Sequence, residues 1–137
     1  MFKAEQQEIE TKIRAYCRDN ALPEPDQIQW AWIPFSGHWG ISTSFFQMAA
    51  LEARQGKKIQ VGARAQELAQ GVADSLGAPR GFERVEAVRG YLNLYFFTPE
   101  YSRRVTDAIL EQSADYGRGV SKNEQVMVEF SQPNTHK

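Results

Sequence analysis

Apolar residues recur along the chain at two spacings, one typical of helices and the other of strands. A spacing of three to four residues predicts four helices, over residues 4–20, 44–55, 61–76 and from Pro99 onward. Alternating apolar and polar residues predict four strands, over residues 28–34, 82–89, 91–97 and 126–130. Only Gly90 separates the two central strands, which favours an antiparallel pair or a bend there. The predicted fold class is therefore α+β, with an antiparallel sheet of about four strands covered by helices.

The same spacing predicts which side chains point inward. Ser42 or Thr43 is suited to cap the second helix, because a side-chain hydroxyl can accept a hydrogen bond from the free N–H groups of the first turn. Two tryptophans of the first strand, Trp30 and Trp32, are expected in the core, and Trp39 is expected to anchor the loop that follows. In the last helix the predicted inward positions are Tyr101, Val105, Ala108 and Ile109.

Composition narrows the class of protein. The chain has 137 residues, of which 42% are hydrophobic, as expected for one globular domain. Its apolar runs are shorter than the roughly 18 to 20 residues that span a bilayer, and its first residues are charged, so we expect a cytoplasmic protein without a membrane segment. The single cysteine, Cys17, can form no internal disulfide and is predicted to be a half-buried structural thiol.

Charge is uneven along the chain. The net charge is −1, but residues 54–104 carry nine basic and five acidic residues, a balance of +4. Such a stretch is consistent with a surface that binds a polyanion and also with an ordinary solvated face.

No familiar catalytic motif is present in the sequence. It contains no P-loop, no G-x-G-x-x-G, no G-x-S-x-G and no H-E-x-x-H pattern. His38 lies in a glycine-rich loop without a placed carboxylate or nucleophile, and it is interpreted as a polar surface group. The sequence contains two histidines, His38 and His136, and one cysteine, Cys17. Their spacing does not match that of a zinc site. We therefore predict neither a catalytic residue nor a metal site within these residues.

The strand over residues 91–97 is more informative. Its alternation places Leu92, Leu94 and Phe96 on a core face and Tyr91, Asn93 and Tyr95 on the opposite face. An exposed tyrosine can stack on an unpaired base while a neighbouring asparagine hydrogen-bonds to the base edge. Arg84 and Arg89 lie just upstream, where they could meet phosphate groups. The alternative is an ordinary half-exposed strand.

Three stretches of the sequence resemble a known family of enzymes. The stretch "VMVEFSQPNTHK" resembles the entry to the catalytic domain of arginyl-tRNA synthetases, of the form V-x-V-E-F-S-x-P-N-x-x-K, which runs into an H-x-G-H signature that binds ATP. "GYLNLYFF" resembles a strand of the N-terminal additional domain of these enzymes, and "ARAQELAQGVADSL" resembles the helix before it. Two departures stand out. Residues 39–44 replace a loop close to G-D-x-S-T-N, and Gln132 stands where a second serine is common.

The resemblance implies a function for the chain and a division into two parts. Residues 1–122 would be an N-terminal domain that recognises the D-loop side of tRNA(Arg), and residues 123–137 a linker and the first strand of a Rossmann-like catalytic domain, cut just before H-x-G-H. The full-length protein would be a class I arginine–tRNA ligase, using ATP with Mg to attach arginine, and a monomer. The tRNA-binding residues would be Tyr91, Asn93, Arg84 and Arg89. Arginine and ATP would be bound, in the full-length enzyme alone, by Glu129, Ser131, Asn134 and Lys137.

The substrate-binding part of this assignment is chemically reasonable, because a carboxylate such as Glu129 suits a cationic amino acid and an asparagine can orient it. A second reading stays open. The chain could be a small stand-alone module that binds RNA or protein and has no enzymatic role.

Overall fold

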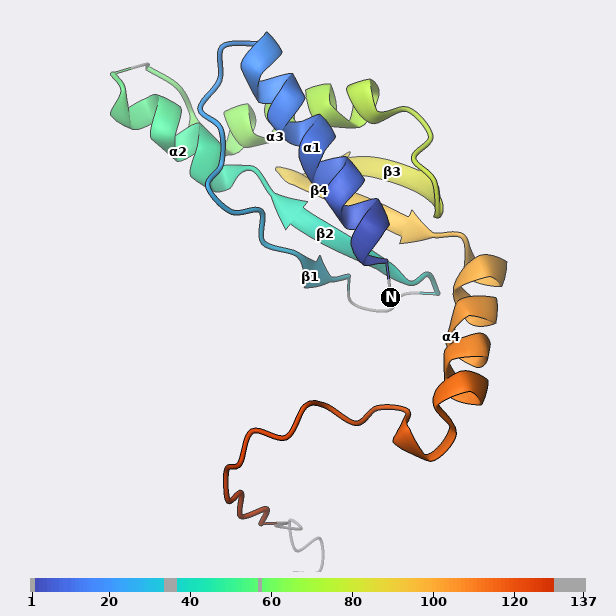
Figure 1. The fold of residues 1–137 in the computed structure, drawn as a ribbon. Helices are drawn as coiled ribbons and strands as arrows, with labels where there is room; N and C mark the ends of the chain where they lie inside the picture. Colours follow the sequence, from blue (N-terminus) through green and yellow to red (C-terminus); the bar gives the residue numbers. More distant parts are fainter. Residues whose placement is uncertain (1, 34–36, 57, 130–137) are drawn as a thin grey trace, which may run out of the picture.

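The structure, a computed structural model, describes residues 2–33, 37–56 and 58–129. Helices and strands interleave along the chain (Figure 1). The elements are α1 (Lys3–Asp19), β1 (Ala31–Trp32), β2 (Gly40–Ser44), α2 (Phe46–Arg54), α3 (Val61–Leu76), β3 (Phe82–Val88), β4 (Tyr91–Phe96) and α4 (Thr98–Gln112), with a short 3₁₀ turn at Ser113–Asp115. The α+β class is confirmed, and the four helices begin and end close to the predicted positions.

The four strands form one antiparallel sheet in the order β1-β2-β4-β3. β3 and β4 are the predicted hairpin around Gly90. β4 pairs on its other side with β2, so that Ile41 lies opposite Leu94 and Ser42 opposite Asn93. The centre of the sheet is therefore built from two strands that are far apart in the sequence.

The predicted cap of α2 is wrong because its residues belong to β2. Ser42 and Thr43 do not cap α2, because both lie within β2, where their backbone pairs with β4. α2 instead has Phe45 as its N-cap residue, without a capping side-chain hydrogen bond. The stretch predicted as a loop and cap is thus a central strand, which the sequence analysis did not foresee.

Two other predicted strands differ from the structure. The first, predicted over residues 28–34, is reduced to Ala31–Trp32, a short strand at the edge of the sheet. The last, predicted over residues 126–130, is not a strand over its described part, residues 126–129, which are exposed. A strand needs a neighbour for its backbone N–H and C=O groups, and these four residues pair with no described segment. Phe130 and residues 131–137 lie outside the described residues.

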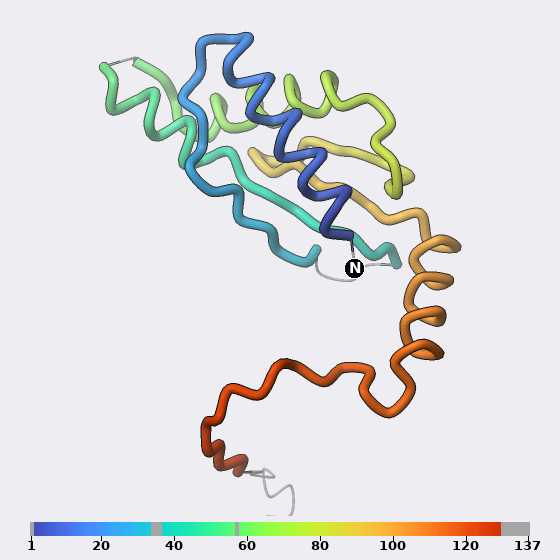
Figure 2. Tube along the Cα trace, viewed as in Figure 1, coloured from blue at the N-terminus to red at the C-terminus, as the bar shows by residue number. Residues whose placement is uncertain are grey.

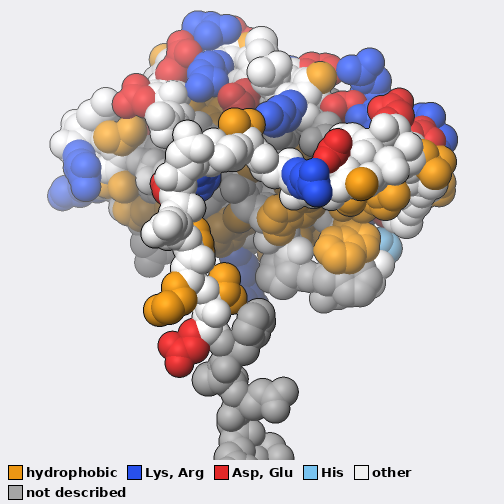
Figure 3. All heavy atoms as spheres, turned by 60° about the horizontal axis from the view of Figure 1, so that its bottom comes forward, with side chains coloured by type: hydrophobic (Ala, Val, Ile, Leu, Met, Phe, Trp, Pro, Cys, Tyr) orange, Lys and Arg blue, Asp and Glu red, His pale blue; other side chains and the backbone are white. Residues whose placement is uncertain are grey.

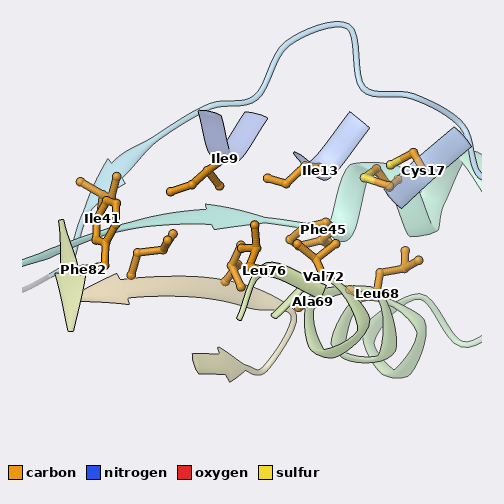
Figure 4. Close-up of a cluster of buried hydrophobic side chains, with 14 of the residues drawn as sticks. Ile9, Ile13, Cys17, Ile41, Phe45, Leu68, Ala69, Val72, Leu76 and Phe82 are labelled. Atoms are coloured by element: carbon orange, nitrogen blue, oxygen red, sulfur yellow. The ribbon is translucent and has the colours of Figure 1, made fainter. Parts of the chain in front are cut away.

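The core lies between the sheet and the two helices α1 and α3. Ile9, Ile13 and Cys17 of α1 and the apolar stripe of α3 point toward one another (Figure 4). Leu92 and Leu94 of β4 are fully buried, which confirms the predicted core face of this strand. Cys17 is also fully buried rather than half-buried, and burial raises the pKa of its thiol.

Two buried carboxylates join helices to one another. Glu52 of α2 is 1% exposed and pairs with Arg64 of α3, with Nε and Oε2 2.7 Å apart. Glu5 of α1 is 5% exposed and lies 2.8 Å from the Arg104 guanidinium of α4. A buried carboxylate is tolerated only with such a partner, so each pair fixes how its two helices meet.

The chain beyond the sheet packs less well than predicted. None of the residues of α4 is buried, and of the predicted inward positions Tyr101 packs against the core while Ile109 is exposed. Residues 116–129 then run away from the body without regular structure (Figure 2). Trp32 was predicted in the core and is 65% exposed, because its strand is at the sheet edge.

The remaining tryptophan predictions fare better. Trp30 is partly buried against the core and donates a hydrogen bond from Nε1 to Glu10, 2.9 Å away. Trp39 stacks on Tyr101 with ring centroids 6.4 Å apart, consistent with an anchor for its loop.

Candidate functional site

The two faces of the sheet differ in their surroundings. α1 and α3 lie over one face (Figure 1), and the side chains of the other face are exposed or half-buried. We call this second surface the open face. Strand pairing arranges its side chains in three rows across β2, β4 and β3. The first row is Ser44, Tyr91 and Val88, the middle row is Ser42, Asn93 and Glu86, and the third row is Gly40, Tyr95 and Arg84.

The middle row holds a hydrogen bond between two strands. The Ser42 hydroxyl donates to Oδ1 of Asn93 over 2.7 Å. On the other side of Asn93 lies Glu86, whose carboxylate is paired with Arg84. Among the described residues, no partner is found for the Asn93 amide nitrogen. The amide therefore has a bound acceptor end and a free donor end.

The first row lies at the hairpin turn. Tyr91 is the first residue of β4 and is 45% exposed, with its ring edge-to-face against Phe46 at 5.5 Å. The predicted pair of Tyr91 and Asn93 is thus brought together on the open face, two residues apart and about 7 Å along the strand.

The turn beside Tyr91 is held by α3. Arg89 and Gly90 both have positive φ, +51° and +84°, as in a tight two-residue hairpin. Gln66 of α3 hydrogen-bonds to this turn through both ends of its amide. Its Nε2 donates to the Ala87 carbonyl over 3.1 Å, and its Oε1 accepts from the Gly90 N–H over 2.8 Å. The turn is therefore fixed in position, with the Arg89 side chain exposed at its tip.

A groove runs beside these residues. It has a volume of about 490 Å³ and extends from β1 to the start of β4, lined by Ala31, Ser42, Arg89, Tyr91 and Asn93 among others. A space of this size matches those that hold small ligands. Viewed from the lower side of Figure 1, hydrophobic side chains gather near the centre of the molecule and charged ones along its upper part (Figure 3).

The two predicted phosphate-binding arginines are separated. Arg84 lies over the ring of Tyr95, with its Cζ 4.0 Å from the ring centroid, and is also paired with Glu86. Arg84 lies four residues before Val88, the neighbour of Arg89 in the chain, and this separation is about 13 Å along β3. Arg89 has no ion pair among the described residues and lines the groove. Of the two arginines, Arg89 lies beside the groove, whereas Arg84 packs against the ring of Tyr95.

Ion pairs reduce the positive charge that the sequence suggested. Of the basic residues between 54 and 104 that the structure describes, four are paired with carboxylates, namely Arg64, Arg84, Arg103 and Arg104. For Arg64 and Arg104 the hydrogen bonds that the guanidinium donates to those carboxylates raise its pKa. Much of this positive charge is therefore held in ion pairs, three of them on helices and one on β3.

His38 lies at the far end of the open face. Its Nδ1 is 3.4 Å from Oε1 of Glu83, and its ring meets Tyr95 edge-on at 6.0 Å. Both groups are partly exposed, and the pair lies away from Asn93.

The residues assigned to arginine and ATP are only partly described. Glu129 is exposed, and Ser131, Asn134 and Lys137 lie outside the described residues. Within residues 2–33, 37–56 and 58–129, no cluster of three histidine, cysteine or carboxylate side chains could hold a metal ion. Over the same residues, no helix has the length and hydrophobicity to cross a membrane.

Two contributors to the site were missed by sequence reasoning. Ser42 is 51 residues from Asn93, and Gln66 lies on a helix 24 residues before Gly90. Alternation over residues 40–44 was the only local signal for Ser42, and it is visible only if this stretch is read as a strand.

Comparison with known proteins gives a consistent result. No family model matches the chain. An arginine–tRNA ligase of Pyrococcus furiosus is 29% identical over 140 aligned positions, which cover all of this chain and 21% of that protein. Those of Methanococcus maripaludis and Clostridium perfringens are 31% and 36% identical over 49% and 42% of the chain, and the matches cover 12% and 10% of those proteins. The chain thus spans about a fifth of its relatives' length or less.

The fold also occurs in a solved structure. The arginyl-tRNA synthetase of Thermus thermophilus matches with a TM-score of 0.50 and 23% identity, over 72% of this chain and 15% of that one.

Proposed function

Because this chain is related to the arginyl-tRNA synthetases, we propose that it is a tRNA-recognition domain of an arginine–tRNA ligase and binds the D-loop side of tRNA(Arg). The observation that carries the proposal is the arrangement of Tyr91 and Asn93 on the open face beside the groove. Residues 1–122 would form this domain, and residues 123–137 would lead into a catalytic domain.

Each of the three residues beside the groove has a distinct role in this proposal. The exposed ring of Tyr91 offers a stacking surface for an unpaired base, which is worth about 1 to 3 kcal/mol. The free amide end of Asn93 can hydrogen-bond to the edge of that base. Arg89 at the hairpin tip meets a phosphate group, which adds affinity for any RNA. Arg84, held by Glu86 and Tyr95, contributes less.

The activity of the whole ligase is a further part of the proposal. The full-length class I enzyme would activate arginine with ATP and Mg and transfer it to the tRNA, as a monomer in the cytoplasm. Glu129, Ser131, Asn134 and Lys137 would then bind arginine and ATP, since a carboxylate pairs well with a guanidinium group. The 137 residues alone are expected not to form arginyl-adenylate. Arginine-dependent ATP–pyrophosphate exchange by this chain, measured with tRNA added, would contradict that expectation.

The binding test compares base contacts with phosphate contacts. Affinities for tRNA(Arg) transcripts with and without D-loop substitutions are measured by fluorescence anisotropy at two salt concentrations. Asn93→Ala should remove the discrimination between these transcripts and leave the salt dependence unchanged. Arg89→Ala should weaken all transcripts alike and reduce the salt slope by about one.

Arg103→Ala serves as the control for Arg89→Ala, because Arg103 is exposed on α4, where it is paired with Asp107. It should leave affinity and discrimination unchanged. Equal discrimination by wild type and Asn93→Ala would contradict the assignment. Recovery of a protein partner by a chain that binds no tRNA would favour the stand-alone interaction module.

A further inference from the structure

The hydrogen bond between Ser42 and Asn93 fixes more than the position of the asparagine. A primary amide has a donor end and an acceptor end, and it can turn by 180° to exchange them. The two ends offer different groups to a ligand. Which end is free therefore decides what the site can recognise.

The cross-strand neighbour on β3 favours one orientation of the Asn93 amide, and the neighbour on β2 is bonded in that orientation. On β3 the neighbour is Glu86, whose ionised carboxylate only accepts hydrogen bonds, so it disfavours the amide oxygen on its side. On β2 the neighbour is Ser42, whose hydroxyl can donate, and it lies 2.7 Å from Oδ1. The amide oxygen is thus turned toward β2 and its nitrogen is left without a partner among the described residues.

We propose that Ser42 is a positioning residue that makes Asn93 a hydrogen-bond donor toward the ligand. The site then selects a nucleobase edge that presents an acceptor, a ring nitrogen or a carbonyl oxygen, and rejects an edge that presents N–H at the same place. This inference rests on the proposed binding of RNA and names the chemical feature of the base that is recognised.

The orientation can be tested without any ligand. In the wild-type chain the side-chain NH₂ signals of Asn93 in a ¹⁵N-resolved NMR spectrum should differ from those of a free asparagine. Ser42→Ala should move them toward free values, and Ser42→Thr, which keeps the hydroxyl, should not. Ser44→Ala is the matched control, since Ser44 lies on the same strand and face but opposite Tyr91. Unchanged Asn93 signals in a folded Ser42→Ala variant would overturn the proposal.

The recognition test uses tRNA(Arg) transcripts. Abasic substitutions along the D-loop first identify the nucleotide whose loss no longer matters in Asn93→Ala. At that nucleotide the natural base is compared with analogues in which one acceptor at a time is replaced by C–H or N–H. The wild type should prefer one acceptor about five-fold, the factor given by a hydrogen bond of ordinary strength. Ser42→Ala should lose most of this preference, and Ser42→Thr and Ser44→Ala should keep it.

The outcomes separate this inference from the proposed function. If the wild type binds no tRNA, or binds it without regard to Asn93, the proposed function is wrong and the role of Ser42 with it. If Asn93 matters and Ser42→Ala keeps the preference, only the role of Ser42 is wrong. An equal loss of affinity for natural base and analogue in Ser42→Ala would show a purely structural role and would also overturn it.

Discussion

α3 and α4 are helices of nearly equal length and similar amphipathic pattern, 16 and 15 residues, yet they are used differently. α3 lies over the sheet and buries five residues, whereas α4 leaves the end of β4 and buries none (Figure 1). An apolar stripe therefore predicts that a segment is helical and does not predict what will cover the stripe.

α4 is attached by contacts near its beginning. Tyr101 stacks on Phe96 at 5.1 Å and on Phe2 at 5.9 Å between ring centroids. One turn further, Arg104 pairs with Glu5 and lies over the ring of Phe2. Because these two residues carry the attachment, the second half of α4 contributes little to the stability of the body.

The largest expected effect tests this difference directly. Leu68→Ala, in α3, should lower the free energy of unfolding by about 2 to 5 kcal/mol, because it leaves a cavity in the core. Ile109→Ala, in α4, should change it by no more than about 0.5 kcal/mol, because the side chain is exposed. Urea denaturation followed by circular dichroism measures both. Similar losses for the two variants would mean that α4 is as well packed as α3.

A smaller effect is expected where α3 meets the hairpin. Gly90 has φ +84°, and an added Cβ would lie 2.9 Å from Cβ of Ala65 and from Cζ of Phe46. Gly90→Ala should therefore cost about 1 to 3 kcal/mol. Gly62→Ala is the matched control, because Gly62 lies in α3 with open space around it, and alanine should stabilise the helix by about 0.5 to 1 kcal/mol. Thermal unfolding should show shifts of opposite sign, and a neutral Gly90→Ala would contradict the close contact.

The smallest effect concerns the attachment of α4. Burial opposes ionisation of Glu5, but the hydrogen bond and charge of Arg104 outweigh it and lower the pKa of the carboxyl below its ordinary value of 4.5. A lowered pKa in the folded state means that the ionised pair stabilises the fold above pH 4.5, and that this contribution is lost as pH falls through the folded pKa.

Because Arg104 is partly exposed and keeps Glu100 as a partner, Glu5→Gln should cost only about 1 kcal/mol at pH 7 and progressively less at pH values below the ordinary pKa. Urea denaturation of both chains between pH 3 and pH 7 measures the difference. Glu8→Gln serves as control, since Glu8 is exposed on α1 and pairs with neighbouring Lys12. A difference between wild type and Glu5→Gln that does not depend on pH would exclude this role of the pair.

The sequence by itself determined the features that depend on neighbouring residues. The helical spacing in α1, α2 and α3, the hairpin around Gly90, and the alternation of Leu92 and Leu94 with Asn93 are all local patterns. Each follows from chain geometry over a few residues, so it can be read without knowing the rest of the fold. The same alternation predicted that Tyr91 and Asn93 share the face of β4 opposite Leu92 and Leu94.

Only the tertiary structure decided the features that join distant segments. The pairing of β2 with β4, which brings Ser42 to Asn93, links residues 51 positions apart. The ion pairs that neutralise Arg64 and Arg104, and the exposure of Ile109, likewise depend on which elements meet. A side chain's periodicity shows which face it occupies, but its partner is set by the packing of the whole chain, and no local pattern contains that information.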